Sequence, residues 1–242
     1  MTMAGVQSGI CPTNSRRRLK LTVVVFVAFV LMYVGLSFVS FAPYTGNKVW
    51  KTTPPCFDSN KPRTSLIKLA HKMHLILDSM GIEHWLMYGS LWGPLRGIPG
   101  PLPWDYDVDI GINGDDGNFS KVPFEEFKAR FTSAGLKVTD KSLRSGNLML
   151  VDQNSENGEK GEVFIFYNHG GVMTLAGYET WIFYINYRVY NSFPAVLVKQ
   201  PLPKVRFGFF NISAPRGGIE IMKYLYPFSW WKVVKPANCE QF

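Results

Sequence analysis

Cysteine and histidine are scarce in this sequence of 242 residues, which has three cysteines and four histidines. They form no cluster with the spacing of zinc ligands, so the sequence predicts no structural zinc site. Acidic residues are missing from the first 42 positions, where four basic residues lie close together (Arg16, Arg17, Arg18 and Lys20). Without those four, the excess of basic over acidic residues falls from eight to four. Because no stripe of Arg and Lys interleaved with stacking aromatics remains, the sequence argues against nucleic acid as a partner.

Charge is also missing from residues 21–42, a run rich in Val, Phe and Leu. At a rise of about 1.5 Å per residue, this run is long enough to cross a hydrocarbon core of roughly 30 Å. The basic cluster before it predicts a cytosolic tail over residues 1–20 and a lumenal remainder. A cleaved signal peptide is the alternative. The run exceeds the roughly 7–15 residues of a signal-peptide core and lacks a small-x-small cleavage site, which favours an uncleaved type II anchor.

Other features fit a domain in the lumen of the Golgi or endoplasmic reticulum. Two N-glycosylation sequons occur, at residues 118–120 and 211–213. In an oxidising compartment Cys56 and Cys239 could pair and join the two ends of the lumenal part. Cys11 would lie in the cytosol near the membrane, either palmitoylated or free. The sequence thus predicts a single-pass membrane protein of the secretory pathway.

Periodicity and turn residues divide the remainder of the chain. Residues 43–63 carry four prolines and predict a stem, which leaves residues 64–242 as the lumenal domain. Apolar spacing predicts two amphipathic helices, and apolar or alternating runs predict strands. The predicted helices are 64–80 and 123–134; the predicted strands are 85–88, 104–110, 147–152 and 163–167, with a polar loop over 111–117.

Two groups with possible ligand chemistry are assigned to structural roles. His71 and His74 lie on the predicted 64–80 helix, where a solvated or capping role is favoured over metal ligation. Residues 172–200 are rich in aromatics, including Trp181. Aromatic side chains can stack on sugars or bases, but such a run more often packs in a core or on a sheet, and that interpretation is favoured here.

The most informative stretch runs from Tyr88 to Gly111 and contains three aspartates spaced two apart, Asp105, Asp107 and Asp109. If residues 104–110 form a strand, the three carboxylates share one face. Clustered carboxylates repel one another, and a hard cation such as Mg²⁺ or Mn²⁺ would relieve that repulsion. An acidic surface turn is the alternative, but the apolar residues between the aspartates favour a half-buried strand.

Gly89 and Ser90 follow the apolar run 85–88, which predicts a strand that ends in a tight turn. Glycine permits close approach of the backbone, and serine offers a hydroxyl and an amide to a phosphate. A Gly-Ser pair alone carries little information. Followed about fifteen residues later by an Asp-x-Asp strand, the pair matches the signature of the nucleotidyltransferase fold.

Over this stretch the sequence GSLWGPLRG…PWDYDVDIGI resembles the core motif of the LicD/fukutin family. The residues in register are Gly89, Ser90, Leu91, Gly93, Arg96, Pro103, Trp104, Asp105, Asp107, Asp109 and Ile110. The resemblance implies an α+β domain with a nucleotidyltransferase-like mixed sheet flanked by helices, preceded here by the transmembrane helix. Members of the family are phosphotransferases that move a phosphorylated alcohol from a CDP donor onto a glycan.

The resemblance also implies roles for the matched residues. Asp107 and Asp109 would hold two Mg²⁺ or Mn²⁺ ions that bind the donor diphosphate. Gly89 and Ser90 would hold donor phosphate oxygens. Arg96 would pair with a phosphate or form a structural salt bridge. Asp105 or Glu162 would orient or deprotonate the acceptor hydroxyl.

The sequence departs from the family pattern in two places. A third family carboxylate commonly lies on the strand at 163–167, where this chain has Phe164. Glu162, two residues earlier, shares a face with that position and could replace the carboxylate; otherwise the third ligand is lost. Tyr106 replaces a common aspartate, but alternation along the predicted strand turns it away from the metal side.

Three classes of function therefore remain. The first is a phosphotransferase that uses ribitol, choline or glycerol phosphate and a glycan or glycoprotein acceptor. The second is an inactive family member that acts as a binding or scaffold protein, which Phe164 favours. The third is a nucleotide-sugar glycosyltransferase, which shares the membrane topology, the Asp-x-Asp motif and Mn²⁺ but does not require the Gly-Ser pair.

Overall fold

The computed structural model describes residues 13–45, 63–154, 159–182, 191–227 and 229–232. The chain divides into two compact units, Met1–Pro43 and Tyr44–Phe242. The predictions about Cys11, Cys56 and Cys239, and about most of the stem, lie outside the described residues.

The described part of the first unit lies in the helix α1 (Thr13–Thr45). Its segment Arg17–Gly35 is long and apolar enough to cross a membrane, with a mean hydropathy of 2.0 and none of it buried. A signal sequence shares these properties, so length and composition support the predicted anchor without distinguishing the two. The helix continues past Ala42, so the first residues of the predicted stem are helical.

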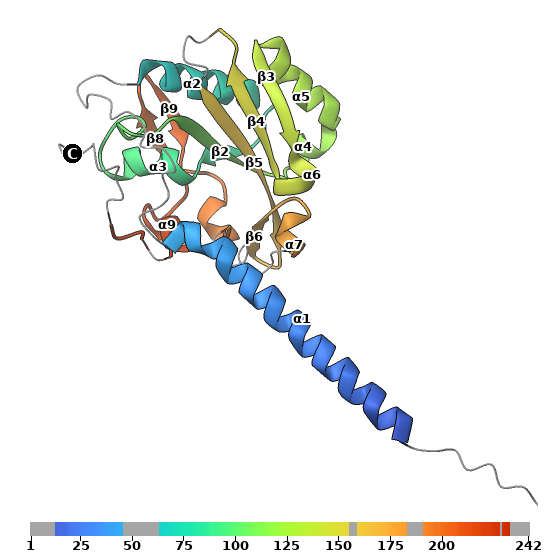
Figure 1. Ribbon diagram of the computed structural model, residues 1–242. Coiled ribbons are helices and arrows are strands. Elements are labelled where there is room, and N and C mark those ends of the chain that lie inside the picture. The colour runs from blue at the N-terminus through green and yellow to red at the C-terminus, as the bar shows by residue number, and fades with distance from the viewer. Residues whose placement is uncertain (1–12, 46–62, 155–158, 183–190, 228, 233–242) are drawn as a thin grey trace, which may run out of the picture. The chain divides into compact units, whose positions relative to one another are not determined.

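The second unit is built on a seven-stranded sheet (Figure 1). Five strands follow the order β1-β2-β5-β4-β3, and β6 and β7 extend the sheet from β5. Strands β2 and β5 are parallel, while the other neighbouring pairs are antiparallel, which confirms the predicted mixed sheet. The strands are β1 (His84–Leu86), β2 (Asp107–Asn113), β3 (Leu136–Lys141), β4 (Asn147–Asp152), β5 (Lys160–His169), β6 (Val172–Leu175) and β7 (Ser192–Pro194).

Helices flank this sheet, as predicted, and a separate hairpin lies beside it. The hairpin is formed by β8 (Lys204–Phe207) and β9 (Phe210–Ser213). The helices are α2 (Thr64–Ser79), α3 (Tyr88–Leu95), α4 (Gly117–Lys121), α5 (Phe124–Ser133), α6 (Ser142–Ser145), α7 (Glu179–Ile182), the 3-10 helix η1 (Ala195–Val198) and α9 (Glu220–Leu225). The predicted helices at 64–80 and 123–134 and the strand at 147–152 are confirmed.

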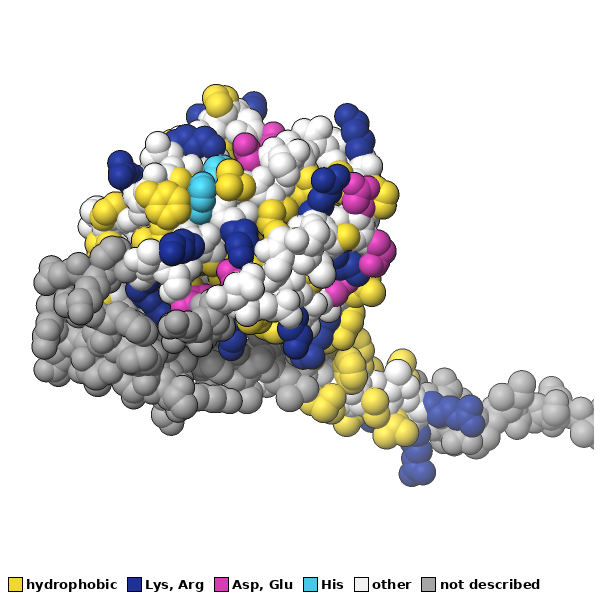
Figure 2. Space-filling view, turned by 90° about the horizontal axis from the view of Figure 1, so that it is seen from above, with side chains coloured by type: hydrophobic (Ala, Val, Ile, Leu, Met, Phe, Trp, Pro, Cys, Tyr) yellow, Lys and Arg dark blue, Asp and Glu magenta, His cyan; other side chains and the backbone are white. Residues whose placement is uncertain are grey.

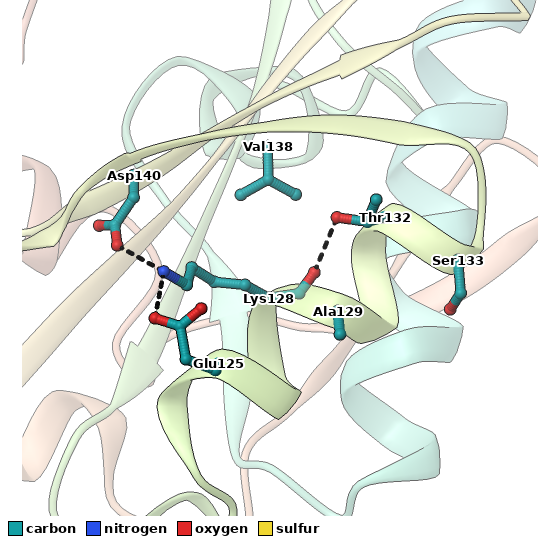
Figure 3. Close-up of a pocket in the computed structure, with 7 residues that line it drawn as sticks. All are labelled: Glu125, Lys128, Ala129, Thr132, Ser133, Val138 and Asp140. Atoms are coloured by element: carbon teal, nitrogen blue, oxygen red, sulfur yellow. Dashed lines mark hydrogen bonds and ion pairs between the residues drawn. The ribbon is translucent and has the colours of Figure 1, made fainter.

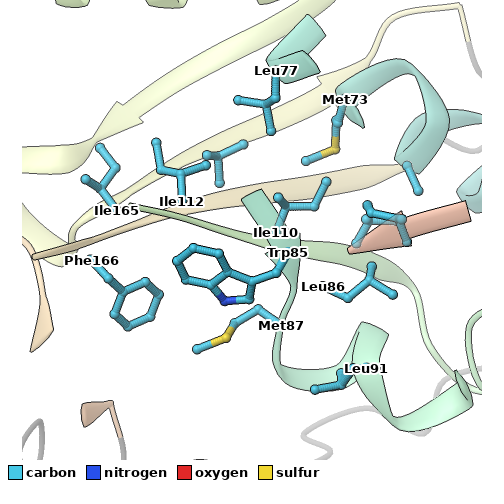
Figure 4. Close-up of a cluster of buried hydrophobic side chains, with 14 of the residues drawn as sticks. Met73, Leu77, Trp85, Leu86, Met87, Leu91, Ile110, Ile112, Ile165 and Phe166 are labelled. Atoms are coloured by element: carbon cyan, nitrogen blue, oxygen red, sulfur yellow. The ribbon is translucent and has the colours of Figure 1, made fainter. Parts of the chain in front are cut away.

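The two faces of the central strands pack against different partners (Figure 4). On one face, α2 lies so close to β5 that a Cβ atom at Gly161 would come within 2.5 Å of the Met73 sulfur. On the other face, the Trp85 indole covers Gly111, where a Cβ would come within 2.7 Å of the indole nitrogen. Figure 4 shows Ile110 on the α2 side and Trp85 on the opposite side. Because side chains alternate along β2, Asp107 and Asp109 lie on the face away from α2.

Several local predictions were wrong. Strand β2 begins at Asp107 rather than Trp104, and it includes the first residues of the predicted 111–117 loop. Gly89 and Ser90 lie in the first turn of α3, not in a turn between strand and loop. Trp181 was assigned to a core or sheet surface, yet 71% of it is exposed. Phe193, from the same aromatic region, is buried as predicted, whereas residues 183–190 lie outside the described part.

Candidate functional site

Four carboxylates gather at the N-terminal ends of the parallel strands β2 and β5. Asp109 on β2 lies directly beside Glu162 on β5 in the strand register, so their side chains leave the sheet on the same face. Asp107 precedes Asp109 by two residues on that face. Asp105 lies just before β2 and is buried. The structure thus brings together the four carboxylates that the sequence singled out.

Gly89 brings the backbone of α3 against this cluster. Its amide donates a hydrogen bond to Asp109 Oδ2 at 3.3 Å. A Cβ atom at Gly89 would lie 3.5 Å from Asp105 Oδ1 and 3.6 Å from Asp109 Oδ2. A methyl group there would contact both carboxylates and fill the space beside them. Glycine therefore leaves room next to the acidic groups, as a site for a metal or phosphate requires.

Ser90 ties α3 to β2. Its Oγ accepts a hydrogen bond from the Asp109 amide at 2.9 Å, and the residue is only 1% exposed. This contact fixes the backbone from which the Asp109 carboxylate projects. In this structure the Ser90 side chain lies beneath the surface of the site and is bonded to the Asp109 amide. Its predicted contact with a donor phosphate stays a prediction.

The remaining two carboxylates are oriented by neighbours. Asp105 Oδ2 accepts a hydrogen bond from the Leu102 amide at 3.0 Å. Glu162 Oε2 accepts one from Asn147 Nδ2 on β4 at 2.9 Å. Each of these two carboxylates is therefore oriented by a hydrogen-bond donor.

Phe164, at the family's third carboxylate position, is engaged in aromatic packing. Its ring meets the Tyr88 ring edge-on, with centroids 4.8 Å apart. The Tyr88 hydroxyl in turn donates to Asn191 Oδ1 at 2.7 Å. Tyr88 adopts a positive φ of 41°, which is uncommon for a residue with a side chain. Phe164 thus helps to hold the start of α3, while Glu162 is the carboxylate that β5 contributes.

Burial raises the pKa of all four carboxylates, and neighbouring negative charges add to the rise for Asp105, Asp109 and Glu162. Burial raises the pKa of Asp105 to about 7, and the charge of Asp107 adds to the rise. For Asp109, burial and then the charges of Asp107 and Glu162 raise the pKa well above its usual value. Burial and Asp107 raise the pKa of Glu162. Burial also raises the pKa of Asp107, although nearby cations oppose it. Holding all four groups ionised is therefore costly without added positive charge.

Two of the cations near this cluster come from outside the aspartate motif. Arg63, immediately before α2, lies within electrostatic reach of Asp105 and Asp107, and its own burial lowers its pKa. Lys160, at the start of β5, lies beside Asp107 in the strand register. Sequence reasoning missed Arg63 because it is over forty residues from the aspartates and no local pattern connects them.

Arg96, predicted to bind phosphate or form a salt bridge, has other contacts in this structure. Its guanidinium lies over the Trp92 ring at 4.4 Å from the centroid and donates to the Lys232 carbonyl at 3.2 Å. Burial lowers its pKa, and the charge of Asp105 opposes this shift. Arg96 therefore borders the site, and its pairing with phosphate stays a prediction.

Tyr106 is closer to the cluster than strand alternation suggested. Because β2 begins at Asp107, the alternation does not extend to Tyr106. Burial of its hydroxyl raises the pKa of Tyr106, and the charges of Asp107 and Asp109 add to the rise. With 49% of the residue exposed, its phenol borders the acidic cluster and remains in contact with solvent.

The ligand atoms of the cluster are of the type that a hard divalent cation binds. Its donors are carboxylate oxygens, which Mg²⁺ and Mn²⁺ prefer, and a cation would relieve the repulsion that raises the pKa values. Within the described residues, no group of three His, Cys, Asp or Glu side chains already stands in the arrangement of a metal site. A metal held by Asp107 and Asp109 therefore stays a prediction.

A second polar site, a shallow groove between α5 and β3, has a different character (Figure 3). Lys128 lies in it, with its Nζ 2.7 Å from Glu125 Oε1 and 3.0 Å from Asp140 Oδ2. The Lys128 ammonium is thus already paired with two carboxylates of the groove. On the face shown in Figure 2, Lys and Arg side chains are interspersed with other types and form no continuous stripe.

Comparison with known proteins identifies the family. Residues 81–217 match the family model described as LicD/FKTN/FKRP, nucleotidyltransferase domain. Over 164 residues the chain is 32% identical to the ribitol 5-phosphate transferase FKRP of Mus musculus and to that of Homo sapiens. These alignments cover 67% of this chain and 30% of each relative. The residues matched by the family model contain α3, β2 and β5 with all four carboxylates, and Arg63 precedes them. The chain belongs to the LicD/FKTN/FKRP family.

Proposed function

We propose that this protein is a membrane-anchored lumenal phosphotransferase. It moves a phosphorylated alcohol from a CDP-linked donor onto a glycan or glycoprotein, with the help of a divalent metal. The observation that carries the proposal is the convergence of four carboxylates, two buried and two half-buried, beside the Gly89 amide. Keeping these carboxylates ionised and close together costs free energy of folding, and a bound cation would offset that cost. A metal-dependent transferase would bind such a cation at this position.

The carboxylates divide into two roles in this proposal. Asp107 and Asp109, adjacent on one face of β2, hold Mg²⁺ or Mn²⁺. When bound, the metal supplies positive charge to the donor diphosphate and the departing CMP. Gly89 leaves the space in which the diphosphate lies. Ser90 fixes the backbone of Asp109 through the 2.9 Å hydrogen bond.

Asp105 and Glu162 are the two candidates for the group that orients or deprotonates the acceptor hydroxyl. Both have a raised pKa, which makes them better bases than an exposed carboxylate. Glu162 is oriented by Asn147 and Asp105 by the Leu102 amide. Substitution of each by the matching amide separates the two, because the residue that acts as base gives the larger loss of turnover with little change in KM.

The relatives indicate which donor to test first. FKRP is named a ribitol 5-phosphate transferase, so CDP-ribitol is the first candidate, with CDP-choline and CDP-glycerol as alternatives. Because the chain aligns with only 30% of the length of those relatives, the donor and acceptor of this protein remain part of the proposal. The proposal includes the membrane of the Golgi or endoplasmic reticulum as the site of the reaction, with the apolar helix as the anchor.

The test is metal-dependent release of CMP by the full chain in detergent micelles. CDP-ribitol, CDP-choline and CDP-glycerol are supplied in turn with Mg²⁺ or Mn²⁺ and a mixture of glycan acceptors. The double variant Asp107→Asn/Asp109→Asn is compared with Glu125→Gln, which removes an exposed carboxylate from the α5–β3 groove. Release that requires metal, survives in Glu125→Gln and disappears in the double variant supports the proposal. Equal release by the double variant contradicts it.

One observation favours a second candidate, an inactive member that binds a ligand without turning it over. Phe164 is packed against Tyr88, so the aromatic ring occupies the position of the family's third carboxylate. Binding of a CDP-linked alcohol and metal without any release of CMP identifies this function. In that case Phe164→Asp is the substitution to examine for gained turnover.

A further inference from the structure

The asparagines of the two glycosylation sequons are both exposed, but they differ in the contacts of the side-chain nitrogen. The first, at residues 118–120, lies within α4, and the second, at residues 211–213, lies on the hairpin strand β9. An N-linked glycan is attached to the side-chain nitrogen of Asn and needs open space beyond that atom. The surroundings of each nitrogen therefore decide which sequon is compatible with a glycan in the folded protein.

The side chain of Asn118 is already used by the fold. Its Nδ2 donates a hydrogen bond to the Gly81 carbonyl at 2.8 Å, and its backbone amide is capped by Asp116 Oδ1 at 3.0 Å. A Cβ atom at Gly81 would lie 3.1 Å from this Nδ2, so the nitrogen is pressed against the turn that follows α2. A sugar on Nδ2 would have to enter this contact.

The rest of the first sequon is equally engaged. Phe119 is only 9% exposed, and its ring packs edge-on against Phe127 with centroids 5.1 Å apart. The hydroxyl of Ser120 donates to the Asp116 carbonyl at 3.0 Å. Phe119 fixes this short helix to the core, whereas Asn118 and Ser120 are exposed, and a bulky group on Asn118 Nδ2 would oppose its contact with Gly81.

Asn211 lies in different surroundings. It is exposed, whereas Ile212 is fully buried, so the side chain of Asn211 points to the solvent side of the hairpin. Across the hairpin it faces Arg206, which is also exposed and whose Nε donates to the Gly208 carbonyl at 2.8 Å. Ser213 accepts a hydrogen bond from Lys204 at 3.0 Å. Asn211 and Ser213 alternate with Ile212 and share one face of β9, on which Asn211 is exposed and Ser213 is only 6% exposed.

We propose that Asn211 carries an N-linked glycan and that Asn118 remains unmodified. In the reaction, Asn211 Nδ2 forms a bond to C1 of an oligosaccharide carried on a lipid diphosphate. The C1–O bond to the lipid diphosphate breaks, the lipid diphosphate leaves, and the amide nitrogen loses one proton. The inference rests on the lumenal orientation of the domain and is independent of its catalytic activity.

The test is the electrophoretic mobility of the full chain made in a eukaryotic secretory host, with and without enzymatic removal of N-glycans. The unaltered chain and Asn118→Gln are expected to show one shift on deglycosylation. Asn211→Gln and Ser213→Ala are expected to show none. Ser213→Thr, which keeps the sequon, is the matched control and retains the shift.

Three results overturn the inference. They are no shift in the unaltered chain, a shift that only Asn118→Gln abolishes, and a double shift that each single variant halves. Release of CMP, measured in parallel, is expected to be the same for Asn211→Gln and the unaltered chain, so failure of the proposed function is seen separately. Thermal unfolding supplies a second readout: Asn118→Gln lowers Tm by loss of the bond to Gly81, and Asn211→Gln does not.

Discussion

Carboxylates are abundant in two regions, the acidic cluster on β2 and β5 and the α5–β3 groove. Their pKa values are shifted in opposite directions. In the groove, burial alone would raise the pKa of Asp140, but hydrogen bonds from Ser142 and Lys128 outweigh it and lower the pKa. In the cluster, burial and like charges raise the pKa of Asp105 and of Asp109. In the groove one lysine forms ion pairs with both carboxylates, whereas in the cluster burial and like charges dominate at Asp105 and Asp109.

This difference separates a structural ion pair from a site that needs a partner. An exposed ion pair such as that of Lys128 contributes little and changes little when it is removed. Buried like charges oppose folding unless a cation joins them, so they mark a position where stability has been given up for function. The predictions that follow test this contrast.

The largest effect is expected for Asp109→Asn. The substitution removes a buried carboxylate from the β2 face at which we propose that the metal binds, and we expect CMP release to fall by on the order of 10³-fold. Because the like-charge repulsion falls as well, Tm in the absence of metal is expected to rise. Steady-state kinetics and thermal unfolding measure the two effects. A lower Tm together with unchanged activity would contradict the contrast drawn between the two regions.

The next effect is a dependence of stability on pH that Asp105 imposes. Its pKa is about 7 in the folded protein and about 3.9 in an unfolded chain. The folded state therefore binds the proton more tightly, and the stabilisation is complete below pH 4 and lost as pH rises through 7. The maximum is roughly 4 kcal/mol.

The measurement is denaturant unfolding of the unaltered chain and Asp105→Asn between pH 4 and 8 without divalent metal. The variant is expected to gain stability relative to the unaltered chain as pH rises. The comparison of two chains is needed because His84, whose burial lowers its pKa to about 4, changes stability in the opposite direction over part of this range. A difference that stays constant with pH would refute the assignment to Asp105.

A smaller effect is expected at Arg63, the cation outside the family motif. Arg63→Gln removes positive charge beside Asp105 and Asp107, and we expect CMP release to fall by roughly 10- to 100-fold. Arg63→Lys keeps the charge and is expected to recover part of the activity, although the fork geometry is lost. If both variants retain full activity, Arg63 has only a structural role.

The smallest effect is expected in the groove. Glu125→Gln breaks the ion pair with Lys128, in which the Glu125 side chain is 86% exposed. We expect Tm to change by less than roughly 2 °C and CMP release to stay the same. A large loss of activity in this variant would show that the groove takes part in the reaction.

The sequence predicted the features that depend on local periodicity. The α2 helix and the β4 strand were correctly placed because their apolar spacing reaches a buried surface directly. The shared face of Asp107 and Asp109 followed from alternation alone. Glu162 was correctly placed on the same face, because the β2–β5 pairing puts it beside Asp109.

Features that depend on contacts between distant segments were not predicted. Gly89 and Ser90 form a helical turn because α3 packs against β2, although a Gly-Ser pair favours a loop. Tyr106 lies nearer the acidic cluster than alternation predicted, because β2 begins only at Asp107, where it pairs with Lys160. The approach of Arg63 to the aspartates requires the position of α2 over the sheet, which no sequence pattern encodes.

The parallel pairing of β2 with β5 has a consequence for the newly made chain. Asp109 and Glu162 lie side by side in the sheet, yet about fifty residues, including β3 and β4, separate them in the sequence, and closing such a loop carries an entropic cost. A chain that has folded only as far as β4 carries two of its acidic groups on an unpaired strand edge. The four carboxylates therefore meet only when the central sheet is complete, which makes binding at this site a measure of successful folding.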